Sequence, residues 1–262
     1  MTAELSPIDT AKYVAAKRAV DFVEHGMRVG LGTGSTAAYM VRALGDLVRD
    51  EGLRIRAVPT STRTADLARE MGIEVITLDE AGWLDLTIDG ADEVDGNLDL
   101  IKGGGGALLH EKIVAAASER MVVIADIGKE VATLGAFPLP VEVIPFGWKS
   151  TQAQIEEMLI NMDVLARDTA RRMTGDSPFV TDEGNYILDL SLARIGDAHR
   201  LSMALNQVPG VVENGLFLDT CDVVVLGHGD GRVETRDINA GTIQEDRLEV
   251  METENLFTDL GN

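Results

Sequence analysis

Residues 86–93 read LTIDGADE, and residues 102–112 read KGGGGALLHEK. The apolar start of the first stretch predicts a buried strand that runs out into a turn at Asp89, and the glycines of the second lead into a helix that begins near Ala107. This pattern places two carboxylates, a lysine, a glycine run and a third carboxylate close together. Ligands of α/β proteins bind where strands end beside the starts of helices, so the two stretches predict an α/β fold with a binding site at this point.

Strand and helix signals alternate on either side of these stretches. Apolar runs predict strands at residues 28–31, 55–58, 74–76, 86–89 and 121–125. Helical spacing of apolar residues predicts helices at residues 11–24, 35–47, 62–71 and 107–118. Such alternation is typical of a parallel, Rossmann-like sheet wound with helices.

The order of elements changes after Leu134. The sequence then predicts, in this order, a strand, a helix, two strands of a hairpin, a helix and a strand at residues 141–144, 151–165, 179–182, 186–190, 197–207 and 211–217. This β-α-β-β-α-β order is the split βαβ, or ferredoxin-like, arrangement. It indicates an inserted α+β domain, after which the apolar strand at residues 222–226 returns to the first sheet.

We therefore expect an α/β catalytic domain built from residues 1–134 and 218–235, with the inserted α+β domain at residues 135–217. The segment from Arg232 onward is acidic and partly helical in pattern, and residues 236–262 are expected to form a C-terminal extension. No apolar run approaches the roughly 20 residues that span a bilayer, and no N-terminal stretch has the basic flank and apolar core of a signal peptide. These absences predict a cytoplasmic protein.

The first glycine loop along the chain, GLGTGST at residues 30–36, has two interpretations that involve a ligand; the second glycine loop is the run at residues 103–106. It fits the dinucleotide fingerprint G-x-G-x-x-G except at Ser35, and the next strand ends in Pro59-Thr60-Ser61, which offers no acid for a ribose. A phosphate cradle fits better, because backbone N–H groups and hydroxyls lie together at a helix N-terminus. The residues concerned are Thr33, Gly34, Ser35 and Thr36. A structural turn without a ligand is the alternative.

The turn Asp89-Gly90-Ala91-Asp92 carries two carboxylates that can face one cleft from the end of the strand. Turn carboxylates that only accept backbone N–H bonds are a common alternative, and Mg²⁺ ligation is another. Lys102 is the nearest cation, and it could balance these acids or donate to an oxygen that gains negative charge. On helical periodicity alone, Glu111 lies opposite the apolar stripe of its helix and would be a surface residue.

Taken together, these segments resemble the type A family of ribose-5-phosphate isomerases. The resemblance also takes in FPLPVEVIP at residues 137–145, VTDEGNYILD at residues 180–189 and PGVVENGLF at residues 209–217. It extends from about Lys12 to about Gly231. The order of the segments makes the set specific, although each segment alone is common.

The resemblance implies that the protein interconverts D-ribose 5-phosphate and D-ribulose 5-phosphate through an enediolate, without a cofactor or a metal. It places the general base on Glu111, whereas the matching position for His110 does not require histidine. Asp89 is expected to assist opening of the furanose ring. Lys102 and Asp92 are expected to stabilise or protonate the sugar oxygens at C1 and C2.

The same resemblance assigns substrate binding to the glycine run and to two further lysines. The glycine residues are Gly103, Gly104 and Gly105, and the lysines, expected at the phosphate, are Lys129 and Lys12. A homodimer or homotetramer is implied. A module that senses a sugar phosphate without turning it over is the alternative from another class, but the predicted sheet begins at Arg28, so we expect no DNA-binding segment ahead of it. The incomplete fingerprint disfavours an NAD-dependent oxidoreductase.

The net charge of the chain limits the kinds of partner that it can bind. The formal net charge is −21 with a sequence pI of about 4.4, which disfavours binding to nucleic acid or to anionic membranes. Lysine is scarce and carboxylates are in excess, a composition that suggests adaptation to concentrated salt. The only cysteine, Cys221, excludes an internal disulfide, and the histidines lack the spacing of metal ligands.

Overall fold

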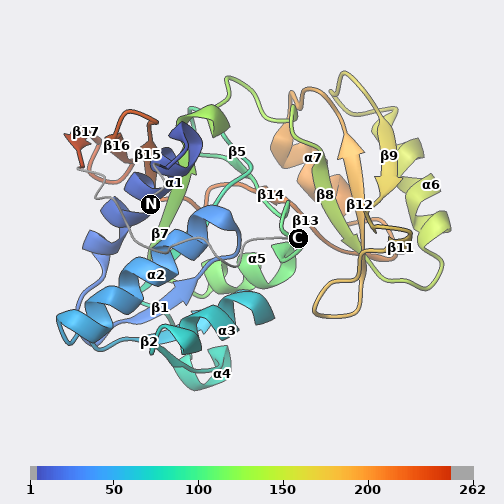
Figure 1. Cartoon of the computed structure of the whole chain (residues 1–262). Coiled ribbons are helices and arrows are strands. Elements are labelled where there is room, and N and C mark those ends of the chain that lie inside the picture. Colours follow the sequence, from blue (N-terminus) through green and yellow to red (C-terminus); the bar gives the residue numbers. More distant parts are fainter. Residues whose placement is uncertain (1–4, 249–262) are drawn as a thin grey trace.

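The structure, a computed structural model, describes residues 5–248 of the chain. A central sheet of eight strands has the order β17-β16-β15-β7-β4-β1-β2-β3, and we call the part built around it the large lobe (Figure 1). Its parallel strands are β1 (Arg28–Leu31), β2 (Arg56–Pro59), β3 (Glu74–Val75), β4 (Leu86–Gly90), β7 (Met121–Asp126) and β15 (Val223–Gly227). The predicted parallel sheet is confirmed, with strand ends within a few residues of the expected positions.

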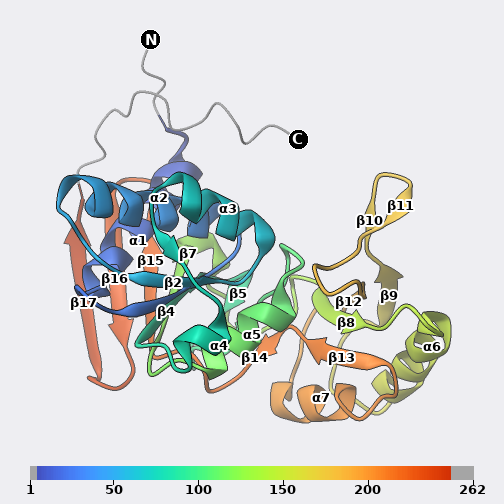
Figure 2. The ribbon, with the colours of Figure 1, turned by 90° about the horizontal axis from the view of Figure 1, so that it is seen from below.

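Helices cover both faces of this sheet, as expected for parallel strands. Figure 2 shows α1 (Pro7–Ala19), α2 (Ser35–Asp50) and α3 (Thr62–Glu70) on one face and α4 (Leu78–Ala81) and α5 (Leu108–Ala116) on the other. Strand β7 shows why both faces need to be covered, because its apolar side chains point alternately to the two faces. Val122 and Ile124 pack into the core under α1 and α2, and Val123 and Ala125 pack into the core on the opposite face. No helix among residues 5–248 has the length and apolar character needed to cross a lipid bilayer.

The order of the parallel strands reverses direction between β1 and β4. Chain order runs outward through β2 and β3 on one side of β1, and through β4, β7 and β15 on the other. The carboxyl ends of β1 and β4 therefore lie at the topological switch point of the sheet, where α/β proteins bind ligands. The first glycine loop follows β1 and the turn 89–92 follows β4, so the fold brings the two motifs together.

A second sheet, of four strands, forms what we call the small lobe, residues 139–214 (Figure 1). Its elements are β8 (Leu139–Val143), α6 (Trp148–Leu159), β9 (Asp168–Arg171), β12 (Tyr186–Ser191), α7 (Ala198–Leu205) and β13 (Val211–Asn214). The antiparallel order β13-β8-β12-β9 places the last and third strands on either side of the first, which confirms the predicted ferredoxin-like arrangement.

The predicted hairpin of residues 179–182 with 186–190 is wrong. Strand β12 pairs instead with β9, and a short ribbon of β10 (Met173–Thr174) and β11 (Ser177–Pro178) lies between them in the chain. Strand β9 escaped prediction because it is a polar edge strand whose side chains are exposed or half-buried. The apolar Phe179 resembles a strand residue in the sequence, but it packs against Gly106 of the large lobe, where a Cβ would lie 2.3 Å from its ring.

Short strands connect the two lobes. A three-stranded sheet has the order β14-β6-β5, from β5 (Glu93–Val94), β6 (Leu100–Ile101) and β14 (Leu216–Phe217). The single strand predicted over 211–217 is therefore divided at Gly215, which passes so close to the second glycine loop that a Cβ would lie 2.4 Å from the Lys102 carbonyl oxygen. Buried Glu93 accepts the N–H groups of Gly135 and Phe137, and thereby fixes the entry to the small lobe.

The helical pattern predicted after residue 232 is also wrong. Strands β16 (Arg232–Asp237) and β17 (Thr242–Arg247) extend the large sheet as an antiparallel ribbon beside β15. In β16 only Val233 belongs to the buried apolar core, and in β17 every residue is exposed. Such strands contain few apolar residues among their acidic ones, so the sequence gives no clear strand signal. The rest of the predicted extension, residues 249–262, lies outside the described residues.

Candidate active site

A cavity of about 160 Å³ lies at the switch point of the large sheet. This volume suits a small polar metabolite better than the larger ligands that fill pockets of roughly 300–1,000 Å³. Almost every residue singled out from the sequence lines it: Lys12, Thr33, Gly34, Ser35, Thr36, Gly90, Ala91, Asp92, Lys102, Gly103, Gly104, Gly105, Glu111 and Lys129. Ile8, Ala37 and Asp126 also line it and were missed by sequence reasoning. For Asp126 a signal existed, because it ends β7 at the same edge of the sheet.

Asp89 is the exception, because it does not line the cavity. It was expected to face the cleft, but its side chain is fully buried beneath it. Oδ1 accepts the N–H of Thr33 at 3.1 Å and of Gly90 at 2.7 Å. These bonds fix the first glycine loop and the turn 89–92 to the end of β4. The approach is so close that a Cβ on Gly32 would lie 2.0 Å from this oxygen. Only glycine fits at position 32 while the Asp89 carboxylate occupies this place.

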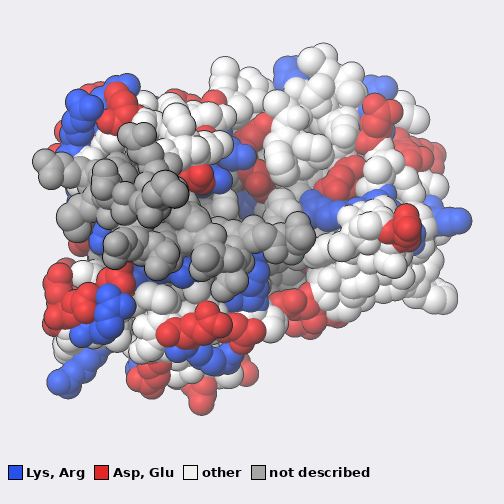
Figure 3. Space-filling model, viewed as in Figure 1, with Lys and Arg blue, Asp and Glu red and all other residues white. Residues whose placement is uncertain are grey.

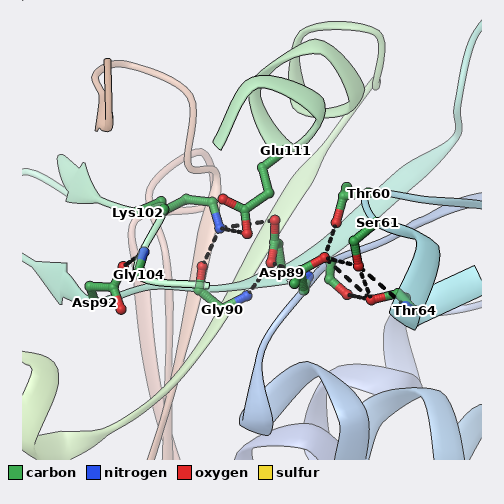
Figure 4. Close-up of polar contacts among 12 residues, drawn as sticks. Thr60, Ser61, Thr64, Asp89, Gly90, Asp92, Lys102, Gly104 and Glu111 are labelled. Atoms are coloured by element: carbon green, nitrogen blue, oxygen red, sulfur yellow. Dashed lines mark hydrogen bonds and ion pairs between the residues drawn. The ribbon is translucent and has the colours of Figure 1, made fainter. Parts of the chain in front are cut away.

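Lys102 lies at the centre of the site and is almost fully buried (Figure 4). Its Nζ lies 2.9 Å from Asp89 Oδ2 and 3.4 Å from Glu111 Oε1, and it donates to the Gly90 carbonyl oxygen at 2.6 Å. The ring of Phe217 lies 5.3 Å away and supports the ammonium group. Burial alone would lower the pKa of Lys102, but the two carboxylates outweigh it and raise that pKa, so the side chain is a fixed positive charge.

Glu111 enters the same cluster from the first turn of α5. The structure buries it, with 3% of its surface exposed, although helical periodicity alone placed it on the surface. Burial raises the pKa of Glu111 to about 8; Lys102 opposes this shift and Asp89 adds to it. Its Oε2 is buried and accepts no hydrogen bond from any residue in the range 5–248. A carboxylate with a raised pKa and a free oxygen at a cavity wall is suited to accept a proton.

The second glycine loop is fastened to the turn 89–92 by Asp92. Its Oδ2 accepts the Gly104 N–H at 2.7 Å (Figure 4), and a Cβ on Gly104 would lie 2.5 Å from the other carboxylate oxygen. A larger residue at position 104 would push the loop off this carboxylate. The glycine run is therefore an ordered wall of the cavity.

The opposite end of the cavity is suited to a phosphate. Gly34 caps α2 with φ of 127°, and Ser35 and Thr36 begin the helix, so their N–H groups have no acceptor within it. Lys12 from α1 and Lys129 from a 3₁₀ turn (Ile127–Lys129) line the same cavity. Both lysines supply positive charge where a phosphate would lie.

Thr33 differs from the other members of this loop. Its N–H is taken by Asp89, and its hydroxyl bonds to Thr60 at 2.7 Å and to Ser61 at 2.8 Å (Figure 4). Its polar groups therefore hold the loop together, although its side chain borders the cavity. Thr33 thus supports the phosphate loop from behind.

His110 does not line this cavity. Its Nε2 lies 2.8 Å from Glu183 Oε1 in the small lobe, and its side chain borders a separate small pocket. This contact favours Glu111 over His110 as the residue that meets a ligand. Within residues 5–248 no group of three or more His, Cys, Asp or Glu side chains is arranged to hold a metal ion.

Comparison with known proteins gives consistent matches. The family model of ribose 5-phosphate isomerase A (phosphoriboisomerase A) matches residues 56–231. The ribose-5-phosphate isomerase A of Ruegeria pomeroyi is 74% identical over 262 residues, which cover 100% of both chains, and that of Roseobacter denitrificans is 70% identical over the same length.

Solved structures agree with these matches. Ribose 5-phosphate isomerase A from Methanocaldococcus jannaschii has a TM-score of 0.79 and 41% identity, with 86% of this chain and 97% of that chain covered. A D-ribose-5-phosphate isomerase in complex with phospho-erythronic acid has a TM-score of 0.80, 41% identity and the same coverage. The ribose 5-phosphate isomerase of Plasmodium falciparum has a TM-score of 0.79 and 33% identity, with 92% and 100% covered.

Proposed function

The chain belongs to the ribose-5-phosphate isomerase A family, and from this premise we propose that Glu111 is the general base of its reaction. The protein interconverts D-ribose 5-phosphate and D-ribulose 5-phosphate, an aldose–ketose isomerisation. The observation that carries the assignment of Glu111 is that this cavity-lining side chain, 3% exposed and with its Oε1 3.4 Å from Lys102, keeps a buried Oε2 without a hydrogen bond from residues 5–248. A carboxylate in this position abstracts a proton without competition from other hydrogen-bond donors.

The proposed reaction starts with opening of the furanose ring, which exposes the aldehyde at C1. Glu111 then removes the proton from C2, the electron pair forms the C1–C2 double bond of an enediolate, and the oxygen at C1 gains negative charge. The hydroxyl proton on the C2 oxygen then passes to the negatively charged C1 oxygen, Glu111 returns its proton to C1, and the C2 oxygen becomes the carbonyl of the ketose. One carboxylate serves both carbons because they are adjacent, and the chemistry needs no external oxidant or reductant.

Lys102 stabilises the charge that develops in this reaction. Its ammonium group is fixed by Asp89 and the Gly90 carbonyl, so it does not need to reorganise when the enediolate forms. Asp92 and the glycine run, Gly103, Gly104 and Gly105, complete the wall around the sugar oxygens. Asp89 acts from below the cavity, through Lys102 and the two loops, rather than by contact with the sugar.

Phosphate binding belongs to the other end of the cavity in this proposal. Lys12, Lys129 and the N-terminus of α2, which line the same cavity as Glu111, would supply it. We also propose that the protein acts in the cytoplasm in the pentose phosphate pathway, as a homodimer or homotetramer. The proposed boundaries are a catalytic domain of residues 1–134 and 218–235, an inserted domain of residues 135–217 and an extension of residues 236–262.

Glu111→Gln tests the proposal, because it keeps the size of the side chain but removes its basicity. Turnover in a coupled isomerase assay should fall by about 10²-fold to 10⁴-fold, the usual contribution of a positioned base. The matched control is Glu119→Gln on the exposed surface just beyond α5, which should keep wild-type turnover. A Glu111→Gln variant that retains more than about a tenth of the wild-type rate would remove Glu111 from the mechanism.

A further inference from the structure

Arg172 connects the small lobe to the second glycine loop. It follows β9, and its Nη1 donates to the carbonyl oxygens of Gly103 at 2.9 Å and Gly104 at 3.1 Å. The rest of its guanidinium group is held by Asp189, which accepts Nε at 2.9 Å and also pairs with Nη2. The Phe179 ring lies 5.8 Å from the guanidinium carbon. The side chain is mostly buried and its position is fixed on several sides.

These contacts determine which way the peptide groups of the loop point. The structure contains no cis peptide bond in its described range, so each carbonyl and the following N–H point in opposite directions. Because the Gly104 carbonyl is turned toward Arg172, the Gly105 N–H is turned away from it. Gly105 lines the cavity, and its N–H donates to no acceptor within residues 5–248. This amide is therefore free to donate to a bound sugar.

The glycines cannot fix this orientation by themselves. Residues 103–106 are all glycine, the residue with the greatest backbone freedom, and Gly103 and Gly106 have φ of 101° and 84°. Side chains outside the loop must therefore select one conformation. Asp92 holds the Gly104 N–H on one side, and Arg172 holds both carbonyls on the other.

We propose that Arg172 is a positioning residue for the isomerisation: clamped by Asp189, it orients the Gly104–Gly105 peptide so that the Gly105 N–H stabilises the charged oxygen of the enediolate. The inference rests on the proposed function. Donors that are fixed before the reaction stabilise developing charge far better than mobile ones, and complete loss of such a donor costs about 10²-fold to 10³-fold in turnover. Release of the peptide from Arg172 loosens the donor without deleting it, so a smaller loss is expected.

The test compares Arg172→Gln with Arg171→Gln. The neighbouring Arg171 is a matched control, because its guanidinium carbon lies 4.4 Å from the Trp148 ring and 5.3 Å from the Tyr186 ring within the small lobe. We expect Arg172→Gln to lower kcat about 10-fold to 100-fold and to leave KM for ribose 5-phosphate nearly unchanged, since the interaction strengthens only as charge develops. Arg171→Gln should keep both constants.

Inhibitor binding separates positioning from a general disturbance of the site. Phospho-erythronic acid carries a carboxylate where the enediolate oxygens would lie, whereas inorganic phosphate needs only the phosphate end. Arg172→Gln should weaken inhibition by phospho-erythronic acid by a factor close to the loss in kcat and should leave inhibition by inorganic phosphate unchanged. Equal weakening of both inhibitors, or of neither, would overturn the proposal.

Asp189→Asn gives a second test if Arg172→Gln folds poorly. The variant keeps the shape of the side chain but weakens the clamp, so kcat should fall by less than in Arg172→Gln, and the double variant should be no slower than Arg172→Gln alone. A double variant whose loss in kcat equals the product of the two single-variant losses would contradict the proposal. A wild-type chain that fails to isomerise ribose 5-phosphate would contradict the proposed function; an active wild type whose Arg172→Gln variant matches Arg171→Gln overturns this inference only.

Discussion

If Glu111 is the general base, as proposed, its pKa should set the pH at which the protein works. Burial raises that pKa to about 8, and a general base acts only when it has lost its proton. The value of kcat/KM should therefore rise as pH increases from 6.5, and it should level off above the pKa of Glu111. A phosphate monoester loses its last proton near pH 6, so a limb at about pH 6 reports the substrate instead. A flat profile between pH 6.5 and 9 would show that the carboxylate is already ionised in the free enzyme.

Lys102 and Lys129 should affect different kinetic constants. Lys102→Ala removes the cation that opposes the raised pKa of Glu111, so the base becomes harder to ionise and kcat should fall. Lys129→Ala removes the proposed phosphate contact, which would be the same in substrate and transition state, so KM should rise while kcat stays close to wild type. Steady-state kinetics with purified variants tests both. A Lys102 variant with normal kcat and a raised KM would reassign this lysine to the phosphate.

Sequence reasoning succeeded for residues whose role depends on position at the end of a strand. Asp92 and Lys102 were placed at one cavity because motif and switch point coincide, whereas Glu111, which helical periodicity placed on the surface, was assigned to the site by the family resemblance. Asp89 was expected in the cleft, but whether a turn carboxylate points outward or accepts the N–H groups beneath it depends on tertiary packing. Arg172 gave no signal, since its partner carbonyls lie in a distant segment of the chain.

At the scale of elements, Lys112 fastens α5 to the segment that links the lobes. Its ammonium group donates to Glu213 Oε1 at 3.0 Å and to the carbonyl oxygens of Asn214 at 2.6 Å and Leu216 at 2.8 Å. Burial lowers its pKa, and Glu213 opposes that shift. Because Glu111 is the preceding residue, this contact also holds the base in place.

Lys112→Met should destabilise the protein by about 1–3 kcal/mol, because it leaves largely buried acceptors without a donor. The free energy of unfolding measured with urea tests this value. Lys149→Met is the control, since Lys149 is exposed and the only contact described for it is with the adjacent Trp148 ring. A loss of stability equal to that of the control would mean that water replaces the lysine without cost.

Strands made of apolar runs could be predicted from the sequence, and polar edge strands could not. The sequence predicts β7 and β15 of the large lobe well, because both strands are buried on both faces and their residues form nearly continuous apolar runs. Strand β9 at the edge of the small sheet and β17 at the edge of the large one expose most of their side chains, so their positions depend on the neighbour that they pair with. Local sequence does not carry that information.

At the scale of the whole molecule, the excess of acid should make stability depend on salt. There are 44 acidic and 23 basic residues, and Figure 3 shows acidic side chains clustered on the face in view, including over α3 and α4, with basic ones beside them. The Debye length falls from about 30 Å at 0.01 M salt to about 3 Å at 1 M, so added salt screens repulsion among the carboxylates. We expect Tm and activity to rise together between about 0.05 M and 1 M KCl.

A titration of Tm against KCl checks this expectation, with sodium chloride as a control for effects specific to potassium. Isolated surface ion pairs weaken over the same range, so a chain held mainly by such pairs would show the opposite trend. A flat or falling curve would exclude adaptation to high salt. It would leave the isomerase assignment untouched, because that depends on the buried cluster around Lys102.

The insertion of the small lobe between β7 and β15 also determines when the large sheet can be completed during synthesis. Strand β7 pairs with β4 on one side, but its other neighbour, β15, is translated only after the whole of the small lobe has emerged from the ribosome. Until then the nascent chain presents an apolar strand with one unpaired edge, the kind of surface to which chaperones and other nascent chains bind. The order of translation therefore makes the pairing of residues 223–227 with β7 the step that fills this open edge, before β16 and β17 extend the sheet.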